Sequence, residues 1–223
     1  MSAPRQPASW SASQLLQRFA VWGRFYERRV DGRDHALRSH LEVFEHDLPW
    51  EQVRDGVPDL VAVMMNPGGS RPLAAADAQG WAPAVPDRTQ YQLMKLALSA
   101  QATALPIRHV RVINLSDLRT PKSAQLFEAL ATIGGWHSIF DPARGAELEQ
   151  ALGSPQTPVL RAWGLSPHLR PLADAALHAL AGRSLLGLSD NGRAFRHPLP
   201  QRADLQRDWL DRMAAQWAQH AQS

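Results

Sequence analysis

Unbroken apolar runs that end at turn residues outline the predicted core of the chain. The run from Val61 to Met65 stops at Asn66-Pro67-Gly68-Gly69. A short apolar run bounded by turn residues is typical of a strand buried on both faces, as in a parallel sheet. Proline has no backbone donor for the ladder, and glycine adopts backbone angles closed to other residues. The pattern therefore predicts a strand over Leu60–Met65, followed directly by a tight loop.

Similar runs predict three further strands, at His109–Leu115, Pro158–Trp163 and Arg183–Leu188. Apolar residues at helical spacing lie between and around the strands. The predicted helices are one from Ser11 with Leu15, Leu16, Phe19 and Trp22 on its apolar face, one capped by Asp87 or Thr89, one from Thr120 to Gly134, a short one through Glu147 and Leu152, one over Pro167–Leu180, and a last one with Leu205, Trp209, Met213 and Trp217. Alternating strands and helices predict an α/β fold with three layers, in which helices cover both faces of a mostly parallel central sheet.

Three segments are less regular. Residues Arg33–Asp47 fit a strand better than a helix. The connection Ser70–Pro86 is long enough to serve as a binding loop or lid, although we favour an ordered surface loop anchored by Trp81. Asp190-Asn191-Gly192 predicts a tight turn that returns the chain as a hairpin arm. We expect residues 1–10 to be flexible and residues 11–223 to form a single α/β domain.

Composition narrows the class of protein. The chain has 223 residues, of which 44% are hydrophobic and 20% charged, as is ordinary for a globular protein. No apolar stretch reaches the length of a membrane span, and the start lacks the apolar run of a secretory signal. We therefore expect a cytoplasmic protein with no membrane partner. The absence of cysteine excludes disulfides, thiol catalysis and cysteine metal sites.

The histidines and the net charge say less about a metal site or a nucleic-acid partner. The nine histidines show no tight metal spacing, so we expect neither a metal nor a cofactor. The net charge is only +3, which does not require a nucleic-acid partner. Lys95 and Lys122 are the only lysines, so nearly all cations are arginines, which suit bidentate phosphate contacts. The composition is thus compatible with a nucleic-acid partner.

Polar and aromatic side chains follow the predicted strands, at the edge where α/β proteins bind ligands. They are Asn66, Asn114, Asp117, Arg119, Trp163 and His197. Motifs for other common chemistries are missing. Gly68-Gly69 lacks the lysine and hydroxyl residue of a P-loop, and neither a dinucleotide glycine pattern nor a Gly-x-Ser-x-Gly nucleophile elbow occurs. The strand ends are therefore the candidate site.

The order of separated motifs between Leu60 and Pro200 resembles the bacterial and phage family numbered 1643 among the domains of unknown function. The motifs are Met64-Met65-Asn66-Pro67, Asp87-x-Thr89, Asn114-Leu115-x-x-Leu118-Arg119, Ala162-Trp163-Gly164, Gly192 and Arg196-His197-Pro198-Leu199. The chain departs from the family pattern at two places. Gly68-Gly69-Ser70 replaces serine-threonine-alanine, and Pro200 stands where the family favours tyrosine.

The same skeleton is similar to the uracil-DNA glycosylase superfamily, through Asn66-Pro67-Gly68, Trp163-Gly164 and His197-Pro198. This resemblance implies a uracil-DNA-glycosylase-like fold. It also implies that Asn66 positions the attacking water and that His197 donates a hydrogen bond to the departing base. Leu199 would be a wedge that helps a base leave a duplex, and Trp81 is the candidate for the aromatic residue on which the base stacks.

The expected function is binding of a nucleobase, nucleotide or nucleic acid, with hydrolysis of an N-glycosidic bond as the candidate reaction. The expected catalytic residues are Asn66, His197 and Asp117, and the expected substrate-binding residues are Pro67, Gly68, Gly69, Arg71, Trp81, Asn114, Arg119, Trp163, Arg196 and Leu199. Two alternatives remain open at this stage. One is a non-catalytic binding module that uses the same pocket, and the other is a different hydrolase with Asp117 as general base. Two further expectations are that Asn66 and His197 face one cleft and that the arginines give salt-sensitive affinity for nucleic acid.

Overall fold

The computed structural model describes residues 9–222, in which the strands form one seven-stranded sheet of order β4-β1-β2-β5-β3-β6-β7. The strands are β1 (Phe19–Val30), β2 (Arg33–Glu45), β3 (Leu60–Met64), β4 (Trp81–Pro83), β5 (His109–Asn114), β6 (Val159–Arg161) and β7 (Leu185–Leu186). The four runs first predicted as strands are β3, β5, β6 and β7. They are neighbours that run parallel, so the prediction that they share one sheet is confirmed.

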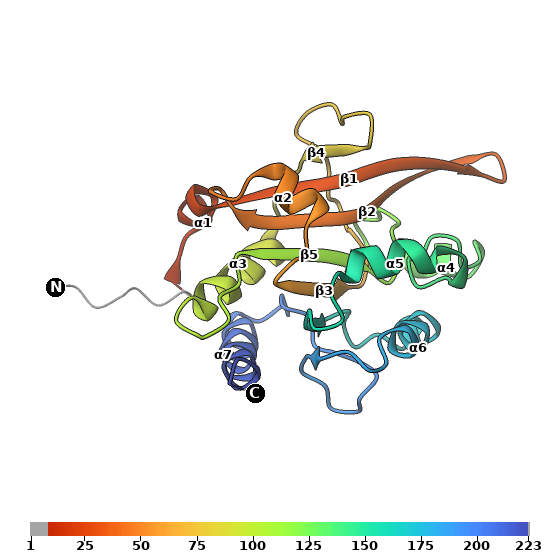
Figure 1. The fold of residues 1–223 in the computed structure, drawn as a ribbon. Helices are drawn as coiled ribbons and strands as arrows, with labels where there is room; N and C mark the ends of the chain where they lie inside the picture. The colour runs from red at the N-terminus through yellow and green to blue at the C-terminus, as the bar shows by residue number, and fades with distance from the viewer. Residues whose placement is uncertain (1–8, 223) are drawn as a thin grey trace.

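The sheet is mixed, and the expectation of a mostly parallel sheet is therefore corrected. Strands β4, β1, β2 and β5 pair antiparallel, and only the other half of the sheet is parallel. The reason is that β1 and β2 form one long hairpin, which joins the sheet beside β5. Figure 1 shows these two strands as a long pair of neighbouring ribbons.

The first helix is shorter than predicted. Ser11 caps α1 (Ala12–Arg18) through a capping box with Gln14, but the helix ends before Phe19, where β1 begins. Burial alternates along the first half of β1, which is the period of a strand. Asp31 and Gly32 then close the hairpin with φ values of 48° and 75°. Positive φ at both central residues is the geometry of the two-residue turn that matches strand twist.

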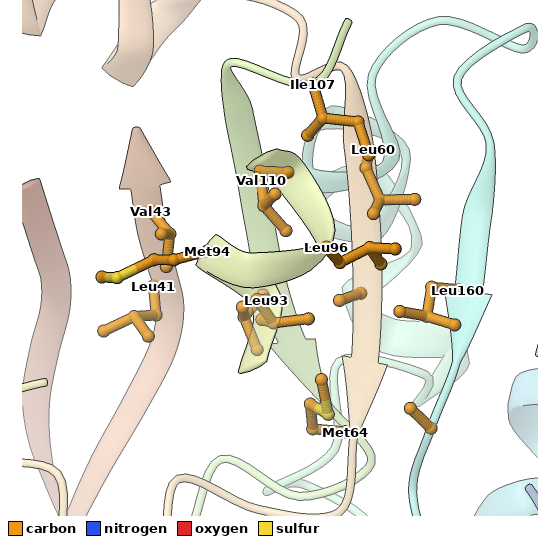
Figure 2. Close-up of a cluster of buried hydrophobic side chains, with 14 of the residues drawn as sticks. Leu41, Val43, Leu60, Met64, Leu93, Met94, Leu96, Ile107, Val110 and Leu160 are labelled. Carbon is orange, nitrogen blue, oxygen red and sulfur yellow. The ribbon is translucent and has the colours of Figure 1, made fainter. Parts of the chain in front are cut away.

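Helices cover both faces of the sheet, which confirms the three-layer α/β arrangement. The remaining helices are α2 (Trp50–Asp55), α3 (Arg88–Ala100), α4 (Ser123–Leu130), α5 (Gly145–Leu152), α6 (Arg170–Ala179) and α7 (Ala203–His220), with short 3-10 turns at Pro142–Arg144 and Pro167–Leu169. Helices α1, α3 and α7 bury their apolar side chains in one core, and α4, α5 and α6 bury theirs in a second core on the opposite face. In Figure 2, Leu93 and Leu96 of α3 lie over the strands of the first core.

The less regular segments are ordered. Trp81 opens β4, pairs with β1 and packs edge-on against Trp50 with ring centroids 5.2 Å apart, so the surface loop is anchored as predicted. The returning arm is also confirmed, because Ser189 and Phe195 form an antiparallel bridge. The flexible start expected for residues 1–10 falls mostly outside the described residues, although Trp10 packs against the first core. No helix in residues 9–222 has both the length and the apolar character needed to cross a membrane.

Candidate functional site

A cavity of about 170 Å³ lies at the carboxyl ends of β3 and β5. It is lined by Arg38, Met64, Met65, Asn66, Pro67, Gly68, Asp87, Thr89, Gln90, Leu93, Val112, Asn114, Thr120, Pro121, Ser123 and His197. The structure thus brings Asn66, Asn114 and His197 together from three separate motifs. The floor, which includes Met64 and Leu93, is buried, whereas the rim at Pro121 is exposed. A ligand can therefore enter from the rim.

Asn66 follows β3, and its amide is held in one orientation. Its Nδ2 donates to the carbonyl oxygens of Leu118 (3.1 Å) and Thr120 (3.0 Å) and to Thr120 Oγ1 (2.9 Å). These bonds use the donor side of the amide and leave Oδ1 as the acceptor. An amide fixed in this way can accept a hydrogen bond from a water or a ligand without losing side-chain entropy.

Asn114 ends β5 and is fully buried, yet neither Nδ2 nor Oδ1 has a hydrogen-bond partner among the described residues. Leaving a buried polar group unpaired costs roughly 1–3 kcal/mol. Such a group in a native protein therefore needs an explanation. Because Asn114 lines the cavity, a ligand with an acceptor beside a donor would satisfy both atoms at once.

His197 offers a neutral donor to the cavity. The backbone N–H of Leu199 donates to its Nδ1 (3.1 Å), which places the ring proton on Nε2. Burial lowers the pKa of His197, and the negative charge of Asp87 opposes that shift. The imidazole is therefore neutral at pH 7, with its Nε2–H free of a described partner and available to donate.

The N-terminus of α3 forms another part of the wall. Asp87 Oδ1 accepts from the backbone N–H groups of Thr89 (2.7 Å) and Gln90 (3.2 Å), and Gln90 Oε1 accepts from the backbone N–H of Asp87, which completes a capping box. Asp87 is the only carboxylate among the described residues that line the cavity. The helix dipole and the two amides offset its charge. The Asp87-x-Thr89 motif is one of those that carry the family resemblance, and the structure adds its residues to the site.

Arg38, on β2, is a lining residue that sequence reasoning missed. It is 1% exposed, and its Nε and Nη1 have no hydrogen-bond partner among the described residues. Burial lowers the pKa of Arg38 to about 10, while the charges of Asp87 and Asp117 oppose the shift, so the guanidinium stays charged at pH 7. The register skips one residue here, since Arg24 pairs with His40 but Phe25 pairs with Arg38.

This irregularity explains how Arg38 reaches the cavity. Strict alternation would place Arg38 on the face opposite Leu41 and Val43, which belong to the core under α3. The extra residue, Ser39, shifts the alternation by one, so that Arg38 lies beside Met64 and Leu93. Bulges near functional sites commonly re-aim a side chain in this way. Because an arginine in an alternating strand normally faces solvent, the sequence alone gave no signal for it.

Several predicted site residues lie elsewhere. Asp117 is fully buried, accepts a hydrogen bond from Tyr26 Oη (2.9 Å) and pairs with Arg144 (2.7 Å). Burial raises the pKa of Asp117 to about 6, although Arg144 and Tyr26 oppose the shift. Trp163 lines a separate cavity of about 240 Å³ and donates to the carbonyl of Arg193. Trp81 lines a third cavity, beside Arg111 and Glu42, so neither tryptophan lies in the walls around Asn66.

The expected phosphate-binding arginines differ in their surroundings. Arg119 donates to the carbonyl of Ser70 (2.6 Å) and lies over the ring of Phe25. Arg196 pairs with Asp190 (3.0 Å). Arg71 is exposed and has no ion pair among the described residues. Gly69 follows the lining residue Gly68, and Leu199 lies two residues after His197, but neither of them lines the cavity.

Comparisons with protein-family models, curated proteins and solved structures gave no match. Within residues 9–222, no group of three or more histidine, aspartate or glutamate side chains has the arrangement of a metal site. The functional argument therefore rests on the geometry of the cavity and on the motifs that line it.

Proposed function

We propose that the chain binds a nucleobase, free or within a nucleotide or nucleic acid, in the cavity lined by Asn66, Asn114 and His197, and that it hydrolyses the N-glycosidic bond to that base. The observation that carries the proposal is the set of hydrogen-bond donors and acceptors that these side chains present to the cavity. Asn114 offers an unpaired donor and acceptor, and His197 offers a neutral donor. Amide-like edges with an adjacent donor and acceptor are what a base presents.

The volume of the cavity suits a ligand with a single ring. An apolar cavity of about 150 Å³ in another protein is known to hold benzene. The volume here, about 170 Å³, suits one six-membered ring, while drug-sized ligands need roughly 300 Å³ or more. The sugar of a nucleoside would then lie at the exposed rim, where Asn66 Oδ1 accepts from the attacking water.

The proposed roles of His197 and Asn66 follow from the charges that develop on the base and the sugar in the transition state. As the glycosidic bond breaks, negative charge grows on the base and positive charge on the sugar. The Nε2–H of His197 stabilises the base, and the fixed amide of Asn66 orients the water. Asn66 cannot act as a base, so the reaction depends on a dissociative transition state.

The experiment is a binding and cleavage screen across free nucleotides, single strands and base-damaged duplexes, followed by His197→Ala on any substrate found. We expect the rate of base release to fall roughly 10²–10³-fold, because the lost bond strengthens as the base departs. Affinity for the base should change much less. His178→Ala, on the exposed face of α6, is the matched control. Unchanged turnover in His197→Ala would contradict the assigned role.

A non-catalytic binding module is the second candidate. It is favoured by the fact that Asp87, the only carboxylate among the described lining residues, is engaged in capping α3. In that case His197→Ala would weaken binding and no substrate would be turned over. The third alternative, with Asp117 as general base, has no support from the geometry, because its carboxylate is buried against Tyr26 and Arg144.

A further inference from the structure

Two buried arginines on neighbouring strands have opposite surroundings. Arg111 of β5 is 4% exposed, and its Nε donates to Glu42 Oε1 (2.8 Å) while Nη2 donates to the carbonyl of Val53 (3.2 Å). Arg38 of β2 is more deeply buried and has neither an ion pair nor a hydrogen bond from Nε or Nη1 among the described residues. Arg111 therefore has the environment of a structural arginine, whereas Arg38 does not.

An unpaired buried charge is among the most costly features a core can contain. The charges of Asp87 and Asp117 favour the charged guanidinium, but within the described residues neither carboxylate forms an ion pair with it. The guanidinium remains charged at neutral pH, so the cost is not relieved by loss of its proton. Binding of an anion in the cavity would remove that cost and pair the free N–H groups.

The other walls of the cavity also supply donors. Among the described residues, neither the amide of Asn114 nor the Nε2–H of His197 has a hydrogen-bond partner, and residues at the N-terminus of α3 line the cavity. The carboxylate of Asp87 lies at the exposed rim, where two backbone amides already hold one of its oxygens. The deep part of the cavity, around Arg38 and Asn114, is therefore electropositive.

We propose that the group bound deep in this cavity is anionic and pairs with Arg38. The inference deepens the proposed function and rests on the same cavity. Its volume accommodates a phosphate, or one ring that carries an anionic substituent such as a carboxylate, but not both a ring and a separate phosphate. The shared chemistry is a compact oxyanion, and a larger ligand would extend past the rim at Pro121 and Ser123.

The first test is calorimetric titration with three probes: inorganic phosphate, the carboxylated pyrimidine orotate, and neutral uracil. Phosphate and orotate distinguish the two sources of the oxyanion. Arg38→Gln should weaken binding of the anionic probe about 30-fold or more, because it removes one partner of a buried charge pair. Uracil affinity should change less than about 3-fold. Arg29→Gln, on the exposed hairpin, is the control and should leave all three affinities unchanged.

The second test is thermal and separates a ligand-binding arginine from a structural one. Arg38→Met should raise the Tm of the unliganded protein by about 2–10 °C, because it replaces an unpaired buried charge with an apolar side chain. Arg111→Met should lower the Tm, because Glu42 loses a buried partner. A fall in Tm for Arg38→Met would overturn the proposal.

The outcomes separate this inference from the proposed function. Suppose that uracil binds more tightly than both anions and that Arg38→Gln does not alter its affinity. That result would overturn the inference and leave the nucleobase proposal in place. Arg38-dependent binding of phosphate with no binding of either ring would support the inference and remove the nucleobase proposal. Absence of binding for every probe would overturn both.

Discussion

Asn114 and Asp117 lie three residues apart, are both fully buried, and have opposite environments. The amide of Asn114 lines the cavity and has no hydrogen-bond partner in the part of the chain that the structure describes, whereas Asp117 is held by Tyr26 and Arg144 away from the cavity. The chain leaves β5 between them, so their side chains reach different sides of the sheet edge. Sequence predicted that both follow a strand, but it did not predict the direction of either side chain. Asp117 is held through Oδ2 alone, because its Oδ1 has no hydrogen-bond partner among the described residues. At the scale of residues, this hold on one oxygen separates a structural group from a candidate functional one.

The raised pKa of Asp117 predicts a pH-dependent contribution to stability. A carboxyl group whose pKa is about 6 in the fold and 3.8 in the unfolded chain binds more protons when folded. Its contribution favours the fold at low pH and is lost as pH rises between these values. Asp117→Asn mimics the protonated form, so the Tm of the variant minus that of the wild type should increase from pH 4 to pH 7.

Thermal melts at half-unit pH steps check this prediction. Asp211→Asn, at an exposed position of α7, controls for the loss of one negative charge. A Tm difference that falls over the same interval would show that the ion pair with Arg144 outweighs the burial of Asp117.

At the scale of elements, the predictable strands were those with short apolar stretches. Every residue of β3 is apolar and buried, and β5 is buried throughout with Val110, Val112 and Ile113 among its polar residues. The start of β1 resembles the end of a helix, because Phe19 and Trp22 are three apart, which suits one helical face. The Asp31-Gly32 turn was the signal that could have corrected this. Strand β4 is only 3 residues long and is defined by its pairing with β1, which no local pattern encodes.

The arm that carries His197 depends on a glycine after β7. Gly187 has a φ of 140°, and a Cβ there would lie 2.6 Å from the carbonyl oxygen of Arg161 and 2.9 Å from Phe195. Gly187→Ala should therefore destabilise the protein by about 1–3 kcal/mol. Because Phe195 would have to move, the position of His197 should change and ligand affinity should fall as well.

Urea unfolding and ligand titration of the same variant measure the two effects. Gly182→Ala is the matched control, because Gly182 also has a positive φ (83°) but nothing within 4 Å of an added Cβ. It should show only the strain of a left-handed residue, about 1 kcal/mol, with affinity unchanged. Equal stability losses in the two variants would contradict a steric role for Gly187.

At the scale of the whole molecule, the fold already engages two of the four cations that lie next to the predicted site motifs in the sequence, which are Arg71, Arg119, Lys122 and Arg196. Arg119 and Arg196 are engaged with Ser70 and Asp190. Arg71 and Lys122 are exposed, and no ion pair holds either of them within the described residues. Sequence predicted an arginine-rich edge with strongly salt-sensitive binding, but it did not indicate which charges the fold consumes. Of these four cations, the structure leaves Arg71 and Lys122 for phosphate contacts outside the cavity.

This count predicts the salt dependence if the ligand is a nucleic acid. Each neutralised phosphate contributes about −0.9 to the slope of log K against log salt for a duplex, and about −0.7 for a single strand. Two contacts, one from Arg71 and one from Lys122, should therefore give a slope of about −1.8 on a duplex and about −1.4 on a single strand.

Titrations between about 50 and 200 mM salt measure this slope. Arg71→Ala should reduce its magnitude by about 0.9 on a duplex, and the double variant with Lys122→Ala should bind with little salt dependence. Arg212→Ala, on the outer surface of α7, should leave the slope unchanged. A wild-type slope steeper than about −4 would require more phosphate contacts than these two cations provide. In that case Arg119 and Arg196 would have to leave their present partners when nucleic acid binds, which makes the slope a direct measure of how far this edge rearranges.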